Sequence, residues 1–461
     1  MNNNEFLAKE PIGKLLFKLS IPTVVAQLIN MLYNLVDRIF IGHMPENGDL
    51  ALTGVGVCLP LIMLVSAFAA LISAGGAPRA SIFMGRKDNE TAEKIMGNCF
   101  FLQIIISIIL TVILLVFNRE LLLLFGASEN TIEYAVKYMN VYAIGTIFVQ
   151  LTLGMNAYIT SQGFSKIAMI TVLIGAVCNI ALDPLFIYGF NMGVSGAALA
   201  TTISQAVSCV FVVTFLFGKK TLLKLRISNF KLDHKIILPC MALGLAPFIM
   251  QASECIIIVS FNSSLLEYGG DVAVGAMTIL SSVMQFAMLP LSGLAQGAQP
   301  ISSYNFGAKN ADRVVKTFKL LLMICLIYSS TLYIFVMTCP NVFVSLFTDK
   351  KELIEFTIKA MRIYFAVLFV FGAQIACQMT LVSTGNAKSS IMVACVRKFV
   401  LLLPLIYIMP AIMEDNTTAV YLAEPIADFL AVTFTVILFT FQFKKSIKGL
   451  KENSNENDIR N

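Results

Sequence analysis

The sequence predicts an all-α integral membrane protein with twelve transmembrane helices, arranged as two six-helix bundles that are related by a parallel internal repeat. Three observations predict this fold class: the composition, the number of long apolar runs, and a set of sequence features that recurs at a fixed spacing. Of the 461 residues, 57% are hydrophobic and only 13% are charged, whereas soluble domains carry about 25% charged residues. Charged residues are therefore too few for a soluble globule of this size.

The apolar runs give the number of membrane crossings. A spanning helix needs about 20 largely apolar residues, and each half of the chain contains six such runs. We expect spans near residues 15–41, 51–75, 97–117, 134–158, 167–188 and 194–217, and near residues 237–264, 272–298, 317–338, 357–382, 390–412 and 418–442. The first run is longer than the core of a cleavable signal peptide, so we expect it to be a spanning helix.

Sequence features of the first half recur in the second half about 222 residues later. The matched pairs include Gly48 and Gly270, Gly75 and Gly297, Pro78 and Pro300, Gly85 and Gly307, Lys87 and Lys309, and Ser161 and Ser383. Because six spans is an even number, both halves enter the membrane from the same side, and the axis relating them should run along the membrane normal. Duplicated membrane helices are typical of secondary transporters, which bind substrate between the repeats.

The distribution of basic residues predicts the orientation. We expect an N-terminal bundle at residues 1–217, a linker at 218–235, a C-terminal bundle at 236–443 and a tail at 444–461. Lys and Arg gather in the linker, in the tail and in the loops after the second and eighth spans, whereas the loops 42–50, 189–193, 265–271 and 413–417 contain none. The positive-inside rule therefore places both termini and the linker on the cytoplasmic side of the membrane. We expect this membrane to be a bacterial inner (cytoplasmic) membrane. We expect the polar stretch 452–461 to be disordered.

Several functions are disfavoured by what the sequence contains. The net charge of +6 is confined to short connecting loops, so we expect no nucleic-acid partner. The loops are too short for a catalytic domain, only two histidines are present, and no phosphate-binding loop of the GxxxxGK[ST] type occurs. The ten cysteines fall almost entirely within apolar runs and indicate packing residues rather than disulfides or metal ligands. We expect neither an enzyme nor a bound cofactor.

Acidic residues inside the first-half spans are the candidates for ion coupling. An acid at the centre of a spanning helix costs about 2.5 to 3.5 kcal/mol, so it needs a partner, a cavity or a function. The first span carries a polar face with helical spacing, made of Gln27, Asn30, Asn34 and Asp37. The fifth span carries Asn179 and Asp183 four residues apart, and Pro184 after them frees a backbone carbonyl.

Asp37 and Asp183 do not follow the repeat, because Val259 and Leu405 stand 222 residues later. This favours a role that belongs to the first half alone. The alternative for Asp37 is a solvated carboxylate at the outer interface beside Arg38, and the alternative for Asp183 is solvation at the end of its helix. If the two carboxylates face one another, they cannot both ionise cheaply in a low-dielectric site.

The second half carries a different set of polar residues within its spans. They are Gln251 and Glu254 in the seventh span, Gln285 in the eighth, Gln374 and Gln378 in the tenth, Arg397 in the eleventh, and Glu424 and Asp428 in the twelfth. Glu254 has either a functional role or a structural role in holding helices together. Arg397 either lines a transport cavity or forms an ion pair with Glu424 or Asp428.

In order along the chain, several motifs resemble those of the multidrug and toxic compound extrusion (MATE) family, in its MepA-like bacterial branch. They are the run from Pro22 through Tyr33-Asn34-Leu35-Val36-Asp37 to Gly42, the run Asn179-Ile180-Ala181-Leu182-Asp183-Pro184, the run Gly193-Val194-Ser195-Gly196-Ala197-Ala198, and the block from Gly293 to Gly307. The resemblance covers nearly the whole chain. It implies a twelve-helix antiporter that exports cationic or amphipathic drugs and dyes in exchange for Na⁺ or H⁺.

The resemblance also implies roles for individual residues. The family's cation site corresponds to Asp37, Asn179, Asp183 and Thr201, and these would also be the Na⁺ ligands. Residues expected to line the substrate cavity are Gln27, Asn34, Asn156, Gln251, Glu254, Gln285, Gln374, Gln378 and Arg397. Another branch of the family uses a carboxylate at the place of Glu254 together with an aspartate in the tenth span. The tenth span here has glutamines instead, which favours the first bundle.

Two alternative functions remain open from the sequence. One is a flippase of a related fold that moves lipid-linked or saccharide substrates, although a large anionic substrate would favour cations in the cavity rather than acids. The other is a membrane-embedded transferase or protease, which two histidines and short loops disfavour. For the transporter, we expect organic cations as substrates, the lipid bilayer as surroundings and a monomer as the assembly.

The topology can be tested by labelling with a membrane-impermeant thiol reagent. In a cysteine-free background, a single cysteine at Asn47 or Asn416 should react from outside intact cells, because both positions lie in loops expected on the outer face. A cysteine at Lys220, in the linker, should react only after the cells are opened. Labelling of the Lys220 position from outside would exclude the twelve-span orientation.

Overall fold

The computed structural model describes residues 5–45 and 47–460, in which every regular element is a helix. The first half contains α1 (Glu5–Lys9), α2 (Ile12–Gly42), α3 (Gly48–Gly85), α4 (Asn89–Val116), α5 (Asn118–Leu124), α6 (Ile132–Ser161), α7 (Ser165–Pro184), the π-helix η1 (Leu185–Gly189) and α8 (Val194–Phe217). The connection between the halves contains the 3-10 helix η2 (Ile227–Asn229). The second half contains α9 (His234–Gly307), α10 (Ala311–Thr338), α11 (Pro340–Val344), α12 (Lys351–Tyr364), η3 (Leu368–Val370), α13 (Phe371–Ser383), α14 (Ala387–Cys395), the π-helix η4 (Val396–Leu402), α15 (Leu403–Ile412) and α16 (Asn416–Arg460).

These elements provide the twelve expected membrane crossings. Among the described residues, ten helices are long and apolar enough to cross a membrane, and the bent pair formed by α12 and η3–α13 makes an eleventh. The 74-residue α9 counts as two crossings, because Gly270 has a non-helical backbone (φ 62°, ψ −163°) that breaks it in the middle. The all-α membrane fold predicted from the sequence is therefore confirmed.

Three local details add to or differ from the expectations. The tenth span, expected near 357–382, is present as a bent pair, because the chain bends by 47° between α12 and η3–α13. The segment 265–271 is a sharp turn at Gly270 rather than a loop of several residues. The polar stretch that begins at Glu452 is helical up to Arg460, where α16 ends, because extending an already nucleated helix is less costly than starting one.

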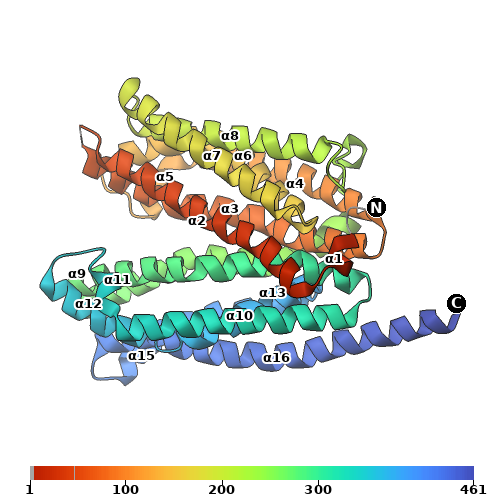
Figure 1. Ribbon diagram of the computed structural model, residues 1–461. Coiled ribbons are helices and arrows are strands. Elements are labelled where there is room, and N and C mark those ends of the chain that lie inside the picture. Colours follow the sequence, from red (N-terminus) through yellow and green to blue (C-terminus); the bar gives the residue numbers. More distant parts are fainter. Residues whose placement is uncertain (1–4, 46, 461) are drawn as a thin grey trace.

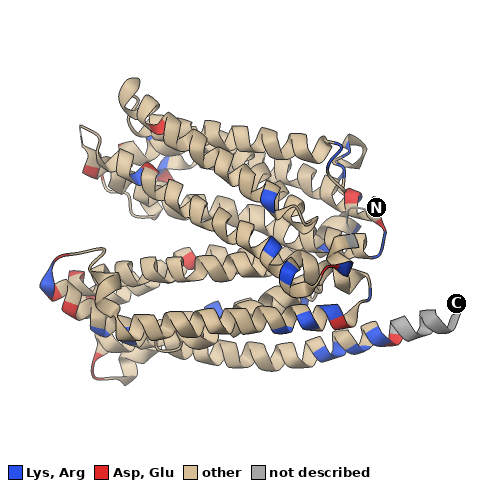
Figure 2. Ribbon diagram, in the orientation of Figure 1, with Lys and Arg blue, Asp and Glu red and all other residues tan. Residues whose placement is uncertain are grey.

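The helices form two bundles that lie side by side along their length (Figure 1). One bundle is built from α2 to α8 and the other from α9 to α16, and the two ends of the chain lie at the same end of the molecule (Figure 1). Lys and Arg gather at this end, which we call the terminal end (Figure 2). The division into two halves agrees with the internal repeat read from the sequence.

The bundles meet through glycines that are themselves related by the repeat. Any side chain on Gly85 of α3 would overlap the backbone carbonyl of Tyr304 in α9, and any side chain on Gly307 would overlap the carbonyl of Ile82. Gly85 and Gly307 are 222 residues apart, and so are Ile82 and Tyr304. One contact is thus the copy of the other, and helices of the two halves touch backbone to backbone at the terminal end.

The connection between the bundles is held on the N-terminal bundle by buried side chains. The Oε1 atom of Gln162 accepts hydrogen bonds from the Thr221 hydroxyl and from the backbone amides of Leu222 and Leu223, each at 2.9 Å. The Glu93 carboxylate accepts from the Arg226 guanidinium at 2.7 Å. The linker therefore packs against the ends of α4 and α6 instead of hanging free between the bundles.

The N-caps at the terminal end also follow the repeat. Asp88 accepts a hydrogen bond from the Thr91 amide at 3.0 Å at the start of α4, and Asn310 accepts from the Arg313 amide at 3.3 Å at the start of α10. The hydrogen bonds from Thr91 lower the pKa of the Asp88 carboxyl. Equivalent caps give equivalent helix starts in both halves.

The glycine contacts predict a position-dependent effect of adding a single methyl group. Gly75→Ala should destabilise the protein by about 1 to 3 kcal/mol, because the new Cβ would overlap the Cys240 carbonyl of the other bundle. Gly56→Ala is the matched control on the same helix, since nothing lies within 4 Å of the new Cβ. It should be neutral or stabilise by up to about 1 kcal/mol. Thermal unfolding of both variants in detergent measures the difference, and equal melting temperatures would contradict this packing.

Candidate functional site

The two acids of the N-terminal bundle lie near the ends of two neighbouring helices. Asp37 is in the last turns of α2, and Asp183 is in the last turn of α7, where Pro184 and the π-helix η1 follow. Proline and the wider π turn both interrupt the regular hydrogen bonding of a helix, an arrangement frequent at functional sites. Both acids are buried, Asp183 completely and Asp37 with 7% of its surface exposed. The low exposure of Asp37 disfavours its interpretation as a solvated interfacial carboxylate.

Asn179 connects the acid on α7 to α8. Its Nδ2 atom donates to Asp183 Oδ1 at 3.3 Å and lies 3.4 Å from Thr201 Oγ1. Three further oxygens of this group are buried without a hydrogen-bond partner, namely Asp37 Oδ1, Asn179 Oδ1 and Asp183 Oδ2. Asp37 and Asp183 are close enough to repel one another electrostatically. The structure thus brings Asp37, Asn179, Asp183 and Thr201 into one region of the N-terminal bundle, which we call the aspartate site.

The aspartate site has the chemistry of a site for a small hard cation. Buried polar groups without partners are costly, and a buried carboxylate needs a cation or a proton. Neither acid forms a salt bridge with Lys or Arg within the described residues. The available donors are carboxylate, amide and hydroxyl oxygens, which suit hard ions. The described residues contain no group of three or more His, Cys, Asp or Glu residues able to hold a metal, so this donor set differs from that of a transition-metal site.

Two tyrosines lie near the aspartate site: Tyr33, which the sequence analysis named only as part of a motif, and Tyr138, which it did not include. The buried Tyr138 of α6 lies beside Thr201 and within electrostatic range of Asp37. Tyr33 stands one turn before Asp37 on α2 and lies near Gln205 of α8. The i, i+4 spacing of Tyr33 and Asp37 was a usable signal, because such residues share a helix face. Nothing in the sequence pointed to Tyr138, which comes from another helix.

The other polar residues of the first half are spread along the bundle. Asn34 is exposed and its Nδ2 donates to the Asn30 carbonyl at 2.7 Å. Gln27 reaches the other bundle, where its Nε2 lies 3.3 Å from Gln296 Oε1. Asn156 donates to the Ala168 carbonyl at 3.2 Å, while its Oδ1 has no partner. These three residues do not join the aspartate site through any of these contacts.

The acids of the C-terminal bundle have basic partners. Glu254 of α9 accepts a hydrogen bond from the ammonium of Lys398 at 2.7 Å, with side-chain exposures of 42% and 5% respectively. The sequence analysis missed Lys398, which lies on the π-helix η4. Gln374 is buried and donates to Gln378 at 3.4 Å, Gln251 is half-buried and Gln285 is exposed. Asp37 and Asp183 of the first bundle thus form no salt bridge within the described residues, whereas the second bundle supplies an internal cation to Glu254.

Arg397 belongs to a buried ion-pair network. Its Nε donates to Asp428 Oδ1 at 2.8 Å, and its Nη2 lies 3.8 Å from Glu424 Oε1. All three side chains are at least nine-tenths buried, and the Arg397 guanidinium also lies over the Phe371 ring at 4.6 Å. Of the two alternatives for Arg397, the ion pair is the one present in the structure, and it holds α16 against η4.

The fold and the asymmetric aspartate site define a multi-pass membrane transporter built from two repeats. The MatE family model matches the chain twice, at residues 22–185 and 246–408. The chain therefore belongs to the MatE family, the multidrug and toxic compound extrusion transporters that the sequence resembled. The two matched segments correspond to the two repeats.

Related sequences and solved structures match this chain over nearly its full length. The multidrug export protein MepA of Staphylococcus haemolyticus (strain JCSC1435) is 23% identical over 429 residues, which cover 93% of this chain and 94% of the relative. MepA of Staphylococcus aureus (strain N315) is 24% identical, with coverage of 94% and 95%. A crystal structure of MATE in the bent conformation superimposes with a TM-score of 0.89 at 23% identity and covers 99% of each chain. An outward-facing multidrug resistance MATE transporter gives a TM-score of 0.88 at 23% identity, with coverage of 97% of this chain and 98% of the other.

The pairing of Glu254 with Lys398 predicts unequal effects of removing either partner. Glu254→Gln leaves a buried ammonium without compensation and should cost about 3 kcal/mol of stability. Lys398→Met leaves a carboxylate that is 42% exposed and partly solvated, which should cost about 1 kcal/mol or less. Denaturant unfolding in detergent measures both. The double variant should be more stable than Glu254→Gln alone; the reverse order of the two single variants would show that this pair is not formed.

Proposed function

We propose that this protein is a multidrug efflux antiporter that exports organic cations in exchange for Na⁺ or H⁺ bound at the aspartate site. The observation that carries the proposal is the set of buried, unpartnered oxygens on Asp37, Asn179 and Asp183, without a basic residue to neutralise them. A cation that enters and leaves during the transport cycle would satisfy them. The relatives named multidrug export protein support the substrate class.

The contrast between the bundles favours coupling through the first bundle. Glu254 already has the ammonium of Lys398 at 2.7 Å, so a coupling ion would have to displace a covalently attached cation. Asp428 likewise has the guanidinium of Arg397 at 2.8 Å. The aspartate site has no such competitor, and binding of Na⁺ or of a proton would remove the repulsion between its two carboxylates.

The contacts between the bundles favour a state that is closed at the terminal end. Along α2, the contacts with the second part of α9 run from Ser20, which donates to the Leu294 carbonyl, through Thr23, which donates to the Gly293 carbonyl at 2.6 Å, to Gln27. Beyond Gln27, no further side-chain hydrogen bond joins α2 to α9 among the described residues, and the two helices diverge toward the other end of the molecule (Figure 1). If the basic terminal end is cytoplasmic, the bundles are apart on the outer side, as expected after drug release.

Exchange of one coupling ion for one monovalent organic cation moves no net charge, so the membrane potential does not contribute and the ion's concentration gradient drives export. A tenfold ion gradient supplies about 1.4 kcal/mol, which supports a tenfold gradient of the drug. A second coupling ion would add the work of the potential, about 2.3 kcal/mol per 100 mV. The ion binds where two carboxylates repel, so its binding free energy differs between states that bring Asp37 and Asp183 together and states that separate them. This difference is what lets an ion gradient bias a conformational equilibrium.

The test is dye efflux from proteoliposomes under imposed gradients. With purified protein, ethidium or a quaternary ammonium dye should be driven out by a sodium gradient, a proton gradient or both, each applied separately. Asp37→Asn and Asp183→Asn should each reduce gradient-driven transport at least tenfold while the protein remains folded. Asp49→Asn, at an exposed acid at the start of α3, is the matched control and should keep wild-type rates.

Two results would contradict the proposal. Wild-type rates in both aspartate variants would place coupling elsewhere, and movement of anionic lipids without any organic cation would favour the flippase alternative. Resistance to several unrelated hydrophobic cations in a pump-deficient host would support the multidrug specificity.

A further inference from the structure

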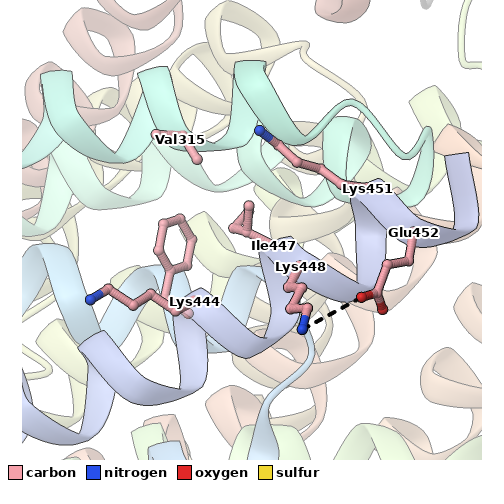
Figure 3. Close-up of a pocket in the computed structure, with 7 residues that line it drawn as sticks. Val315, Lys444, Ile447, Lys448, Lys451 and Glu452 are labelled. Atoms are coloured by element: carbon pink, nitrogen blue, oxygen red, sulfur yellow. Dashed lines mark ion pairs between the residues drawn. The ribbon is translucent and has the colours of Figure 1, made fainter. Parts of the chain in front are cut away.

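A groove lies between α10 and α16 at the terminal end of the C-terminal bundle. The aspartate site lies in the other, N-terminal bundle. Its apolar lining consists of Val315 of α10 and Phe443 and Ile447 of α16. Its charged lining consists of Lys444, Lys448, Lys451 and Glu452, all on α16 (Figure 3). The groove therefore joins an apolar floor from two helices to a lysine-rich rim.

The apolar floor is built and fixed by ring packing. Phe443 packs against Phe318 of α10 with ring centroids 5.3 Å apart and against Phe439, one turn earlier on α16, at 4.8 Å. Phe318 in turn packs against Phe439 at 4.5 Å. This cluster holds the two helices together just below the groove, so the floor is part of the bundle rather than a loose surface.

The lysines of the rim remain available for a ligand. Lys448 lies 3.7 Å from Glu452, and Lys451 lies 3.6 Å from Asp312, both longer than a charge-assisted hydrogen bond. The Lys448 and Lys451 side chains are 79% and 61% exposed. Within the described residues, Lys444 forms no ion pair. Three ammonium groups thus face two carboxylates, which leaves a net charge of about +1.

The position of the groove along α16 corresponds to the headgroup region of a membrane. The apolar run of the last span ends near residue 442, and the lysines follow in the next turns of the same helix. At 1.5 Å per residue, Lys444 to Lys451 extend over about 10 Å, and the polar layer on one side of a bilayer is about 5 to 8 Å thick. If the hydrocarbon core ends near residue 442, the first of these lysines lie at the level of the lipid phosphates, and Phe439 lies at the level of the acyl chains.

We propose that this groove binds an anionic phospholipid of the adjacent leaflet. The phosphodiester contacts Lys444, Lys448 and Lys451, and the start of an acyl chain lies on Val315, Phe443 and Ile447. A lipid with a single negative charge, such as phosphatidylglycerol, neutralises the net positive charge of the rim, whereas a zwitterionic lipid does not. The bound lipid would bridge α10 and α16, two helices that the chain connects only through the rest of the C-terminal bundle.

The test uses the full-length protein in detergent, with lipid binding measured by native mass spectrometry. Phosphatidylglycerol should bind as a discrete adduct more tightly than phosphatidylcholine. Lys444→Gln combined with Lys448→Gln should weaken phosphatidylglycerol binding about thirty-fold, because each lysine near an anionic headgroup contributes a factor of about five. Lys219→Gln combined with Lys220→Gln is the matched control, since both lysines are exposed at the same end and the charge change is equal; it should leave binding within about twofold.

A second variant separates a built groove from diffuse attraction. Ile447→Ser keeps every charge but makes the floor polar, and it should weaken phosphatidylglycerol binding without changing the affinity for inorganic phosphate. Three results would overturn the proposal: equal losses in the two double lysine variants, unchanged lipid binding in Ile447→Ser, or competition by millimolar inorganic phosphate. Because the readout is binding rather than transport, it does not depend on the function proposed above.

Discussion

The cost of charge in a low-dielectric environment is the constraint that shapes this molecule. Moving an ion from water into an apolar interior costs several kcal/mol of solvation free energy even after the protein relaxes around it. Each ionised acid inside the membrane therefore needs a nearby cation or hydrogen-bond donors. The C-terminal bundle compensates permanently, with Lys398 on Glu254 and Arg397 on Asp428. The N-terminal bundle leaves Asp37 and Asp183 without a basic partner. Under the proposed antiport, the compensating cation or proton would come from outside the chain.

The scaffold that carries these charges is nearly symmetric. The reciprocal contacts of Gly85 with Tyr304 and of Gly307 with Ile82 show that duplication preserved the helix crossing in detail. Side chains at a crossing would force the helices apart, so glycine is required in both copies. In the proposed antiport, symmetric packing would let the bundles move as units about their shared interface, and the asymmetric charges would let only one of them bind the ion. The chain assigns these two features to different residues, the glycines at the helix crossings and the buried acids.

Sequence reasoning predicted the fold because composition, span length and repeat spacing are properties of long segments. It also predicted the members of the aspartate site, since Asp37 and Asp183 break the repeat. It failed where a single local geometry decides the outcome. Arg397 was identified but its neighbour Lys398 was missed, because adjacent residues of a regular helix point in different directions and only the structure shows that each has a buried acidic partner, Asp428 for Arg397 and Glu254 for Lys398. The bend after Tyr364 depends on packing, and the helix beyond Glu452 depends on the propagation of α16. The spacing of apolar residues in the sequence predicts neither.

The same physics explains why a lysine in the second bundle can matter for a cation exporter. Lys398 is a cation that cannot diffuse away, so it holds the Glu254 carboxylate in one charge state whatever the ion gradient. Without it, two bundles would each offer acids, and ions could bind to either with no fixed relation to conformation. Under the proposed antiport, a permanent cation in one bundle and an exchangeable one in the other would make ion occupancy depend on a single pair of helices, α2 and α7. That restriction would couple ion movement to one conformational change.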